Sequence, residues 1–196
     1  MVLLTEKERE TLLVLFKDFT AYYNANSISK VLGISHVGAQ KIFKRLLKGN
    51  LVKDQQIGKS IVHKLRLEDD YACKLIAFLL ADEANNFKRW KEEFKELFKK
   101  DRIVILFGSA VKDYKTARDL DIMVVMGKKD YKEVKRLIDN KREILPKRIH
   151  SIELTEADLI KNVKKRQEAV MDIVKNGIVL YGQDKYVESI KNAASF

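Results

Sequence analysis

The chain has 196 residues, of which 39 are Lys or Arg and 28 are Asp or Glu, so its formal net charge is +11. Apolar residue types make up 46% of it, but none of their runs reaches the roughly 18 residues of a membrane-spanning helix. The first residues lack the basic start of a signal peptide, and the single cysteine gives no disulfide. These features exclude a membrane span and a disulfide scaffold, and they predict a cytoplasmic protein of two small domains.

The first fifty residues show a helix-turn-helix pattern. Residues 5–24 predict a helix, because Thr5 and Glu8 have the spacing of a capping box and apolar residues follow at helical spacing. Residues 26–32 predict a short second helix, and Gly33 begins a tight turn. Ser35 then caps a third helix that is predicted to end at Lys48.

A β-hairpin is predicted directly after these helices. Residues 51–56 and 61–67 have strand character, and a turn at 57–60 separates them. Helix-turn-helix plus hairpin over residues 5–68 resembles the winged helix of many prokaryotic transcriptional regulators. The resemblance implies double-stranded DNA as a partner.

Charge in this segment supports a nucleic-acid partner. Residues 27–64 contain eight Lys or Arg and one acid, and a phosphate backbone is the natural counterion for such a surface. Within the third helix, Ala39, Phe43 and Leu46 are expected to face the core. Lys59 at the hairpin tip would reach a flanking phosphate, while protein docking remains the alternative use of a winged helix. The side chains left to face a major groove are Ser35, His36, Gln40, Lys41 and Lys44.

Residues 71–100 are predicted to be helical, with a break at Asn85 and Asn86. The first apolar stripe, which includes Leu75 and Leu79, is expected to pack under the winged helix or against a second subunit. A homodimer is a further expectation, because palindromic operators need two-fold symmetric readers. The second stripe is expected to cover a sheet, and it consists of Phe87, Trp90, Phe94 and Phe98.

The most informative motif lies at residues 107–122. Residues 102–107 predict a strand buried on both faces, and Gly108 then turns the chain so that a ligand can approach the backbone. Ser109 is expected to cap a following helix, whose N-terminus would hold phosphate. Asp119 and Asp121 begin a second strand, and alternation places both carboxylates on one face, where they can reach the same hard cation.

These residues resemble the signature of the DNA polymerase beta superfamily of nucleotidyltransferases, in particular its minimal branch. That signature is Gly-Ser followed some ten residues later by Asp-x-Asp, and Gly108, Ser109, Asp119 and Asp121 match it. The resemblance covers roughly residues 85–190 and implies Mg²⁺ or Mn²⁺ with a nucleoside triphosphate, ATP by expectation. It also implies a third acid on a later strand, and Glu153 is the carboxylate in that strand.

A simpler interpretation competes with this one. Gly-Ser after a strand is a common turn, and Asp-Leu-Asp can open a strand at a solvent edge. Neither explains the order of strand, Gly-Ser, Asp-x-Asp, strand, helix and strand with an acid. The predicted fold is therefore α+β, a winged helix-turn-helix followed by a nucleotidyltransferase-like mixed sheet flanked by helices. The predicted domains are a winged helix over 1–70, a helical linker over 71–86 and a nucleotidyltransferase domain over 87–196.

The resemblance implies transfer of a nucleoside monophosphate to a protein or small-molecule hydroxyl. Asp119 and Asp121 would hold two Mg²⁺ ions, and Glu153 would help bind the second or take the proton. His150 is expected to point away from these acids. Minimal nucleotidyltransferases often act as antitoxins on an all-helical HEPN toxin, and the winged helix suits autoregulation. The alternative is a transcriptional regulator whose nucleotidyltransferase-like domain only binds nucleotide or a partner.

Overall fold

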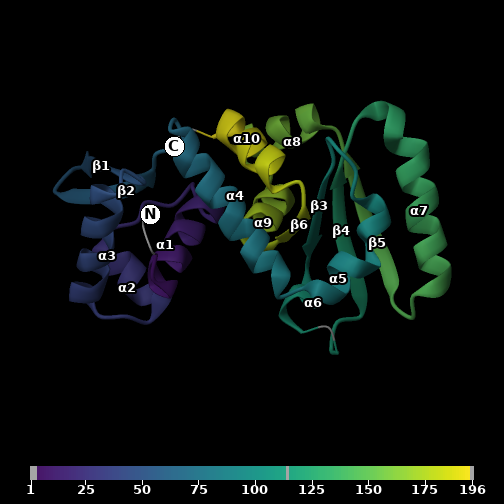
Figure 1. Ribbon diagram of the computed structural model, residues 1–196, viewed down its shortest axis with the longest axis horizontal. Helices are drawn as coiled ribbons and strands as arrows, with labels where there is room; N and C mark the ends of the chain where they lie inside the picture. Colours follow the sequence, from purple (N-terminus) through teal and green to yellow (C-terminus); the bar gives the residue numbers. More distant parts are fainter. Residues whose placement is uncertain (1–3, 114, 195–196) are drawn as a thin grey trace. The chain divides into compact units, whose positions relative to one another are not determined.

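The computed structural model describes residues 4–113 and 115–194 and combines helices with two β-sheets (Figure 1). Contacts divide the chain into two compact units, and the division falls between Leu79 and Leu80. Among the helices described, none has the length and apolar character that crossing a membrane requires.

Three helices open the N-terminal unit, and each begins where the sequence supplies a cap. The Thr5 side chain accepts a hydrogen bond from the Glu8 backbone, and the Glu8 carboxylate accepts one from the Thr5 backbone at 2.8 Å. Gly33 ends the second helix in the left-handed conformation, with φ 62°. The helix predicted over 5–24 ends earlier, at Lys17, because Asp18 leaves the helical conformation with φ −113° and ψ 47°. The helices are α1 (Glu6–Lys17), α2 (Ala25–Leu32) and α3 (His36–Lys48).

A β-hairpin completes this unit as a winged helix-turn-helix. Strands β1 (Val52–Ile57) and β2 (Ser60–Leu65) are antiparallel, and Gly58 takes φ 57° in the turn between them. The backbone N–H of His63 donates to the carbonyl of Tyr23 at 2.8 Å, which adds a short third bridge. The predicted helix-turn-helix and hairpin are thus both confirmed.

The core of this unit is the inward face of the three helices. Phe16, Ile28, Phe43 and Leu46 are all buried, and Ala39 lies on the same face of α3 as Phe43 and Leu46. Truncating one such phenylalanine costs about 3–5 kcal/mol of stability. The expected inward face of α3 is therefore the observed one, and its opposite face is left to solvent.

A long helix and two short ones follow, with the break where the two asparagines predicted it. Trp90 and Phe94 are buried, and Phe87 and Phe98 pack against the same core cluster. The elements are α4 (Asp70–Asn85), α5 (Lys88–Glu93) and the 3-10 helix η1 (Lys95–Leu97).

The C-terminal unit is built on a four-stranded mixed sheet in the order β5-β4-β3-β6. Strand β3 is antiparallel to both β4 and β6, whereas β4 and β5 are parallel. The parallel pair needs a crossover connection, and α7 provides it. The strands are β3 (Ile103–Phe107), β4 (Asp119–Val125), β5 (Arg148–Leu154) and β6 (Ile178–Tyr181).

Helices cover both faces of this sheet. On one face, Trp90 and Phe94 join Val134 and Ile138 of α7 in a cluster with alternate strand residues such as Ile122. The other face is contacted by α10, against which α8 packs (Figure 1). The remaining helices are α6 (Ser109–Lys112), α7 (Tyr131–Ile144), α8 (Glu156–Lys164), α9 (Glu168–Asn176) and α10 (Gln183–Ala193), with the 3-10 helix η2 (Lys128–Asp130).

The edge strand β5 is covered by an arginine. The Arg142 Nε donates to the carbonyl of Ile149 at 3.1 Å, and its Nη2 donates to the Ser151 hydroxyl at 3.1 Å. Asp139 holds the same guanidinium at 2.6 Å. Part of the open hydrogen-bonding edge of β5 is therefore already occupied.

Candidate active site at the Gly108 turn

Gly108 forms the turn that leaves β3, and two separate constraints require a glycine there. Its φ of 75° is one that L side chains rarely adopt, and a Cβ at this position would overlap the carboxylate of Asp121. Ser109 is the first residue of α6 rather than its cap, so the expected capping bond is absent from this turn. Its side chain is exposed instead, at the surface beside Asp121. The turn therefore presents backbone and a hydroxyl next to an acid.

The two aspartates lie on one face of β4, as strand alternation predicted. Asp119 and Asp121 are half-buried. Leu120 and Ile122, which alternate with them along the strand, are buried on the opposite face of the sheet. Asp121 is paired with Phe107 across the antiparallel strands, which places its carboxylate directly beside the Gly108 turn. The structure thus brings Gly108, Ser109 and both aspartates together.

His150, and not Glu153, is the β5 residue that meets these acids. The parallel register pairs Asp121 with His150, and the His150 Nδ1 lies 3.4 Å from the Asp121 Oδ1. The expectation that His150 points away was wrong, because opposite residues of a pair share one face. Arg148 is similarly opposite Asp119 and is exposed.

Glu153 lies elsewhere. It is paired with Val124, three residues further along the strand from the Asp121–His150 pair. Three residues span roughly 10 Å of strand and change the face of the sheet. Glu153 therefore belongs to the face covered by α7, and the structure does not support it as the third acid.

The side chains near the Gly108 turn meet only some of the requirements of a metal site. Among residues 4–113 and 115–194, no group of three or more His, Cys, Asp or Glu side chains gathers to hold a metal. Mg²⁺ is nevertheless commonly bound by one or two carboxylates together with substrate phosphates. Asp119 and Asp121 meet that requirement for a Mg²⁺ ion that arrives with a triphosphate, whereas a three-carboxylate site for two ions is not formed.

The segment between the turn and the aspartates is basic and locally ordered. Asp113 accepts from the backbone of Lys115 at 2.9 Å, and Lys147 at the start of β5 donates to the carbonyl of Ala117. Lys112, Lys115 and Arg118 are exposed on this segment. They add positive charge to the segment that leads to Asp119.

The predicted DNA-facing residues form the exposed face of the winged helix. Each of Ser35, His36, Gln40, Lys41 and Lys44 is exposed on α3 or at its cap, and Lys59 is exposed at the hairpin tip. A groove of about 400 Å³ runs between α3 and the hairpin, and His36, Gln40 and Lys44 line it.

His63 of β2 also lines this groove. Its ring stacks on Phe43 with centroids 3.8 Å apart, and its Nδ1 lies 2.8 Å from Asp54. Burial lowers the pKa of His63, although the Asp54 carboxylate opposes that shift. The hairpin is thus attached to α3 through a ring that favours its neutral form.

Comparison with known proteins finds a family match within the sheet unit. Residues 92–186, just under half of the chain, match the family model described as Polymerase beta, Nucleotidyltransferase. No curated protein matches the chain significantly. The crystal structure of the adhesin competence repressor (AdcR) from Streptococcus pyogenes is similar at a TM-score of 0.37 and 14% identity, over 47% of this chain and 67% of that one. The matched segment contains the Gly108 turn and both aspartates, so the candidate site lies within the part of the chain that is similar to the polymerase beta nucleotidyltransferases.

Proposed function

We propose that this protein is a DNA-binding, metal-dependent nucleotidyltransferase that moves AMP from ATP to a hydroxyl group. The observation that carries the proposal is the contact of Asp121 with the Gly108 turn, inside a domain that matches the polymerase beta family. Two carboxylates beside a turn with an exposed hydroxyl are the groups that a metal-bound triphosphate needs.

The chain's own groups position the nucleotide. Ser109 and the backbone after Gly108 are placed to donate hydrogen bonds to phosphate oxygens. Asp119 and Asp121 would hold Mg²⁺, which neutralises phosphate charge when bound. Lys112, Lys115 and Arg118 add positive charge around the same face. Catalysis by such a site consists of positioning and charge neutralisation.

The proposed transfer forms one bond to the α-phosphorus and breaks another. The acceptor hydroxyl oxygen forms a bond to the α-phosphorus, the bond from that phosphorus to the β-phosphate bridging oxygen breaks, and pyrophosphate leaves. The proton of the hydroxyl is released to water by way of the exposed imidazole of His150, the base that lies beside Asp121. Glu153 takes no part, because it lies on the other face of the sheet.

The acceptor proposed here is a protein hydroxyl, with a small-molecule hydroxyl as the second choice. An all-helical HEPN toxin is the acceptor that the family resemblance implies, and autoregulation through the winged helix would accompany it. Intact-mass measurement of a candidate toxin incubated with ATP, Mg²⁺ and the protein tests this directly. A mass increase equal to one or more AMP groups is expected, and none is expected with Asp121→Asn.

The triphosphate site is tested without knowing the acceptor by following thermal unfolding of the full chain. Each nucleoside triphosphate is added with and without Mg²⁺. A ligand at about a hundred times its Kd adds roughly 2.7 kcal/mol, which raises the Tm of a chain of this size by about 5–10 °C. A Mg²⁺-dependent rise that Asp121→Asn removes is the expected result.

Two further variants make that experiment decisive. Glu153→Gln should keep the full shift, because its side chain is on the opposite face, and His150→Gln should keep most of it. The absence of any shift with all four triphosphates would overturn the proposed triphosphate site.

The second candidate function is a transcriptional regulator whose nucleotidyltransferase-like domain binds nucleotide without transferring it. The displacement of Glu153 from the aspartates favours it, since the expected third acid is not at the site. Triphosphate binding without release of pyrophosphate, in the presence of every acceptor tried, distinguishes this function from the first.

DNA binding is proposed for the exposed face of α3 and for the hairpin tip. Fluorescence anisotropy with a labelled duplex at several salt concentrations measures it. Removing two phosphate contacts with Lys41→Gln and Lys44→Gln should lower the slope of log K against log salt by roughly 0.9 for each contact. The same charge change on α7, Lys132→Gln with Lys135→Gln, is the control and should leave the slope unchanged. Light scattering on the same samples tests the proposed homodimer.

A further inference from the structure

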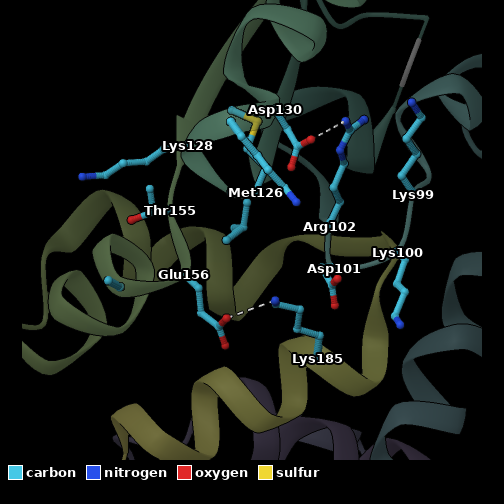
Figure 2. A pocket seen from close by; sticks show the side chains of 14 residues that line it. Lys99, Lys100, Asp101, Arg102, Met126, Lys128, Asp130, Thr155, Glu156 and Lys185 are labelled. Atoms are coloured by element: carbon cyan, nitrogen blue, oxygen red, sulfur yellow. Dashed lines mark ion pairs between the residues drawn. The ribbon is translucent and has the colours of Figure 1, made fainter.

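A cavity in the sheet unit is lined by residues that precede β3 and follow β4, at the end of these strands remote from the aspartates. Figure 2 shows its lining side chains. The cavity has a volume of about 650 Å³, within the range of small-molecule sites. Strand β4 ends at Val125, and Met126, the next residue, lines the cavity. The extended chain from Asp121 to Met126 spans roughly 16 Å, which separates the aspartates from the cavity. The proposed transferase site therefore does not explain this cavity.

Arg102, just before β3, is the central feature of the cavity wall. Only 2% of this residue is exposed, and its Nη2 pairs with Glu133 at 2.8 Å and with Asp130 at 3.5 Å. The Nη1 of the same guanidinium is buried and has no hydrogen-bond partner among the described residues. A buried charged donor without an acceptor is costly, so an acceptor oxygen supplied by a ligand would stabilise it.

The lining of the cavity has an excess of positive charge. Six basic residues and three acids line it, and Glu133 outside the lining pairs with two of the basic residues. Lys185 is matched by Glu156 at 3.1 Å, and Lys99 by Glu133 at 2.6 Å. Among the rest, Lys100, Lys128 and Lys129 are exposed. The lining residues with charge are Lys99, Lys100, Asp101, Arg102, Lys128, Lys129, Asp130, Glu156 and Lys185.

We propose that this cavity binds a small phosphorylated molecule that carries a diphosphate or triphosphate group. An unfilled guanidinium N–H and the exposed ammonium groups of Lys100, Lys128 and Lys129 match phosphate groups in sign. Met126 and the exposed Ala157 add apolar lining, which a nucleoside attached to the phosphates would contact. The same diphosphate chemistry is present in free pyrophosphate and in a nucleoside diphosphate.

The test is calorimetric titration of the full chain with pyrophosphate and, separately, with ADP, both in EDTA so that no metal-dependent site is loaded. Lys128→Gln with Lys129→Gln should weaken binding roughly tenfold or more, because both side chains are at the cavity. Lys164→Gln with Lys165→Gln is the matched control, since these adjacent exposed lysines on and after α8 do not line the cavity. Tighter binding of ADP than of pyrophosphate would identify a nucleotide as the source of the phosphates.

Arg102 is tested by Arg102→Lys, which keeps the charge but removes the second guanidinium N–H. Circular dichroism identifies any loss of folding, and a folded variant with weaker binding supports the proposal. Asp121→Asn should bind pyrophosphate as the wild type does. Loss of binding in Asp121→Asn, an equal loss in the α8 control or no binding at millimolar pyrophosphate would each overturn the proposal. Competition by a short DNA duplex with equal loss in that control would assign the cations to nucleic acid instead.

Discussion

The two ends of the mixed sheet differ in charge and in shape. At one end, Asp119 and Asp121 stand beside a tight turn, and no enclosed cavity surrounds them among the cavities described above. At the other end, basic side chains surround a cavity with a buried arginine. The acidic end needs a cation to bind a phosphate, whereas the basic end binds phosphate directly. The cavity and the proposed transferase site therefore lie at opposite ends of the sheet.

The largest effect is expected from removing both carboxylates of the acidic end. Asp119→Asn with Asp121→Asn should lower release of pyrophosphate from ATP by at least about a hundredfold, because the metal-bound triphosphate loses its protein ligands. Binding of pyrophosphate in EDTA should be unchanged in the same variant. A parallel loss of both properties would show that the two ends are not independent.

A smaller effect is expected from Gly108→Ala. The added Cβ would overlap the Asp121 carboxylate in a left-handed backbone conformation, so the Tm should fall by about 4–10 °C. Gly58→Ala is the control, because it has a similar φ of 57° but open space around the new Cβ. An equal fall in both variants would mean that backbone conformation alone, and not contact with Asp121, requires the glycine.

A lower pH is expected to destabilise the basic end of the sheet through protonation of Glu133. Hydrogen bonds from Lys99 and Arg102 hold the pKa of Glu133 below its usual range. The carboxylate therefore stabilises the fold above the ordinary glutamate pKa, and this stabilisation is lost as the pH falls through the lowered value. Glu133→Gln should show a smaller drop in Tm between pH 7 and pH 3.5 than the wild type. Glu143→Gln, at an exposed position of the same helix, should keep the wild-type drop.

The smallest effect is expected from Glu153→Gln. Its side chain lies on the α7 face, so the triphosphate-induced shift in Tm should stay within about 1 °C of the wild-type value. A loss comparable to that of Asp121→Asn would restore Glu153 as the third acid and contradict the strand register described here.

Local signals in the sequence were sufficient for most of the fold. The caps at Thr5 and Ser35, the left-handed Gly33 and the turn at Gly58 each act within a few residues, and each fixes the beginning or end of an element. The break between α8 and α9 is different, because it comes where Arg166 takes φ 51°. A positive φ at an arginine has no signature in composition or periodicity.

The site was predictable only as far as single strands determine it. Alternation along β4 was enough to place Asp119 and Asp121 on one face. The choice between His150 and Glu153 depended on the register between β4 and β5, which α7 and the core packing set over a long sequence separation. The basic cavity was missed for a related reason, since its lysines and Arg102 come from several separate segments.

The guanidinium of Arg142 on the outer edge of β5 limits how a protein acceptor can approach. An unprotected edge strand invites a foreign strand to extend the sheet, which leads to aggregation or to peptide capture. Here the carbonyl of Ile149, next to His150, already accepts from Arg142. An incoming strand cannot pair at that point without displacing the arginine from Asp139 as well. A protein acceptor for the proposed transfer therefore cannot add a strand at this point of β5 while Arg142 stays in place.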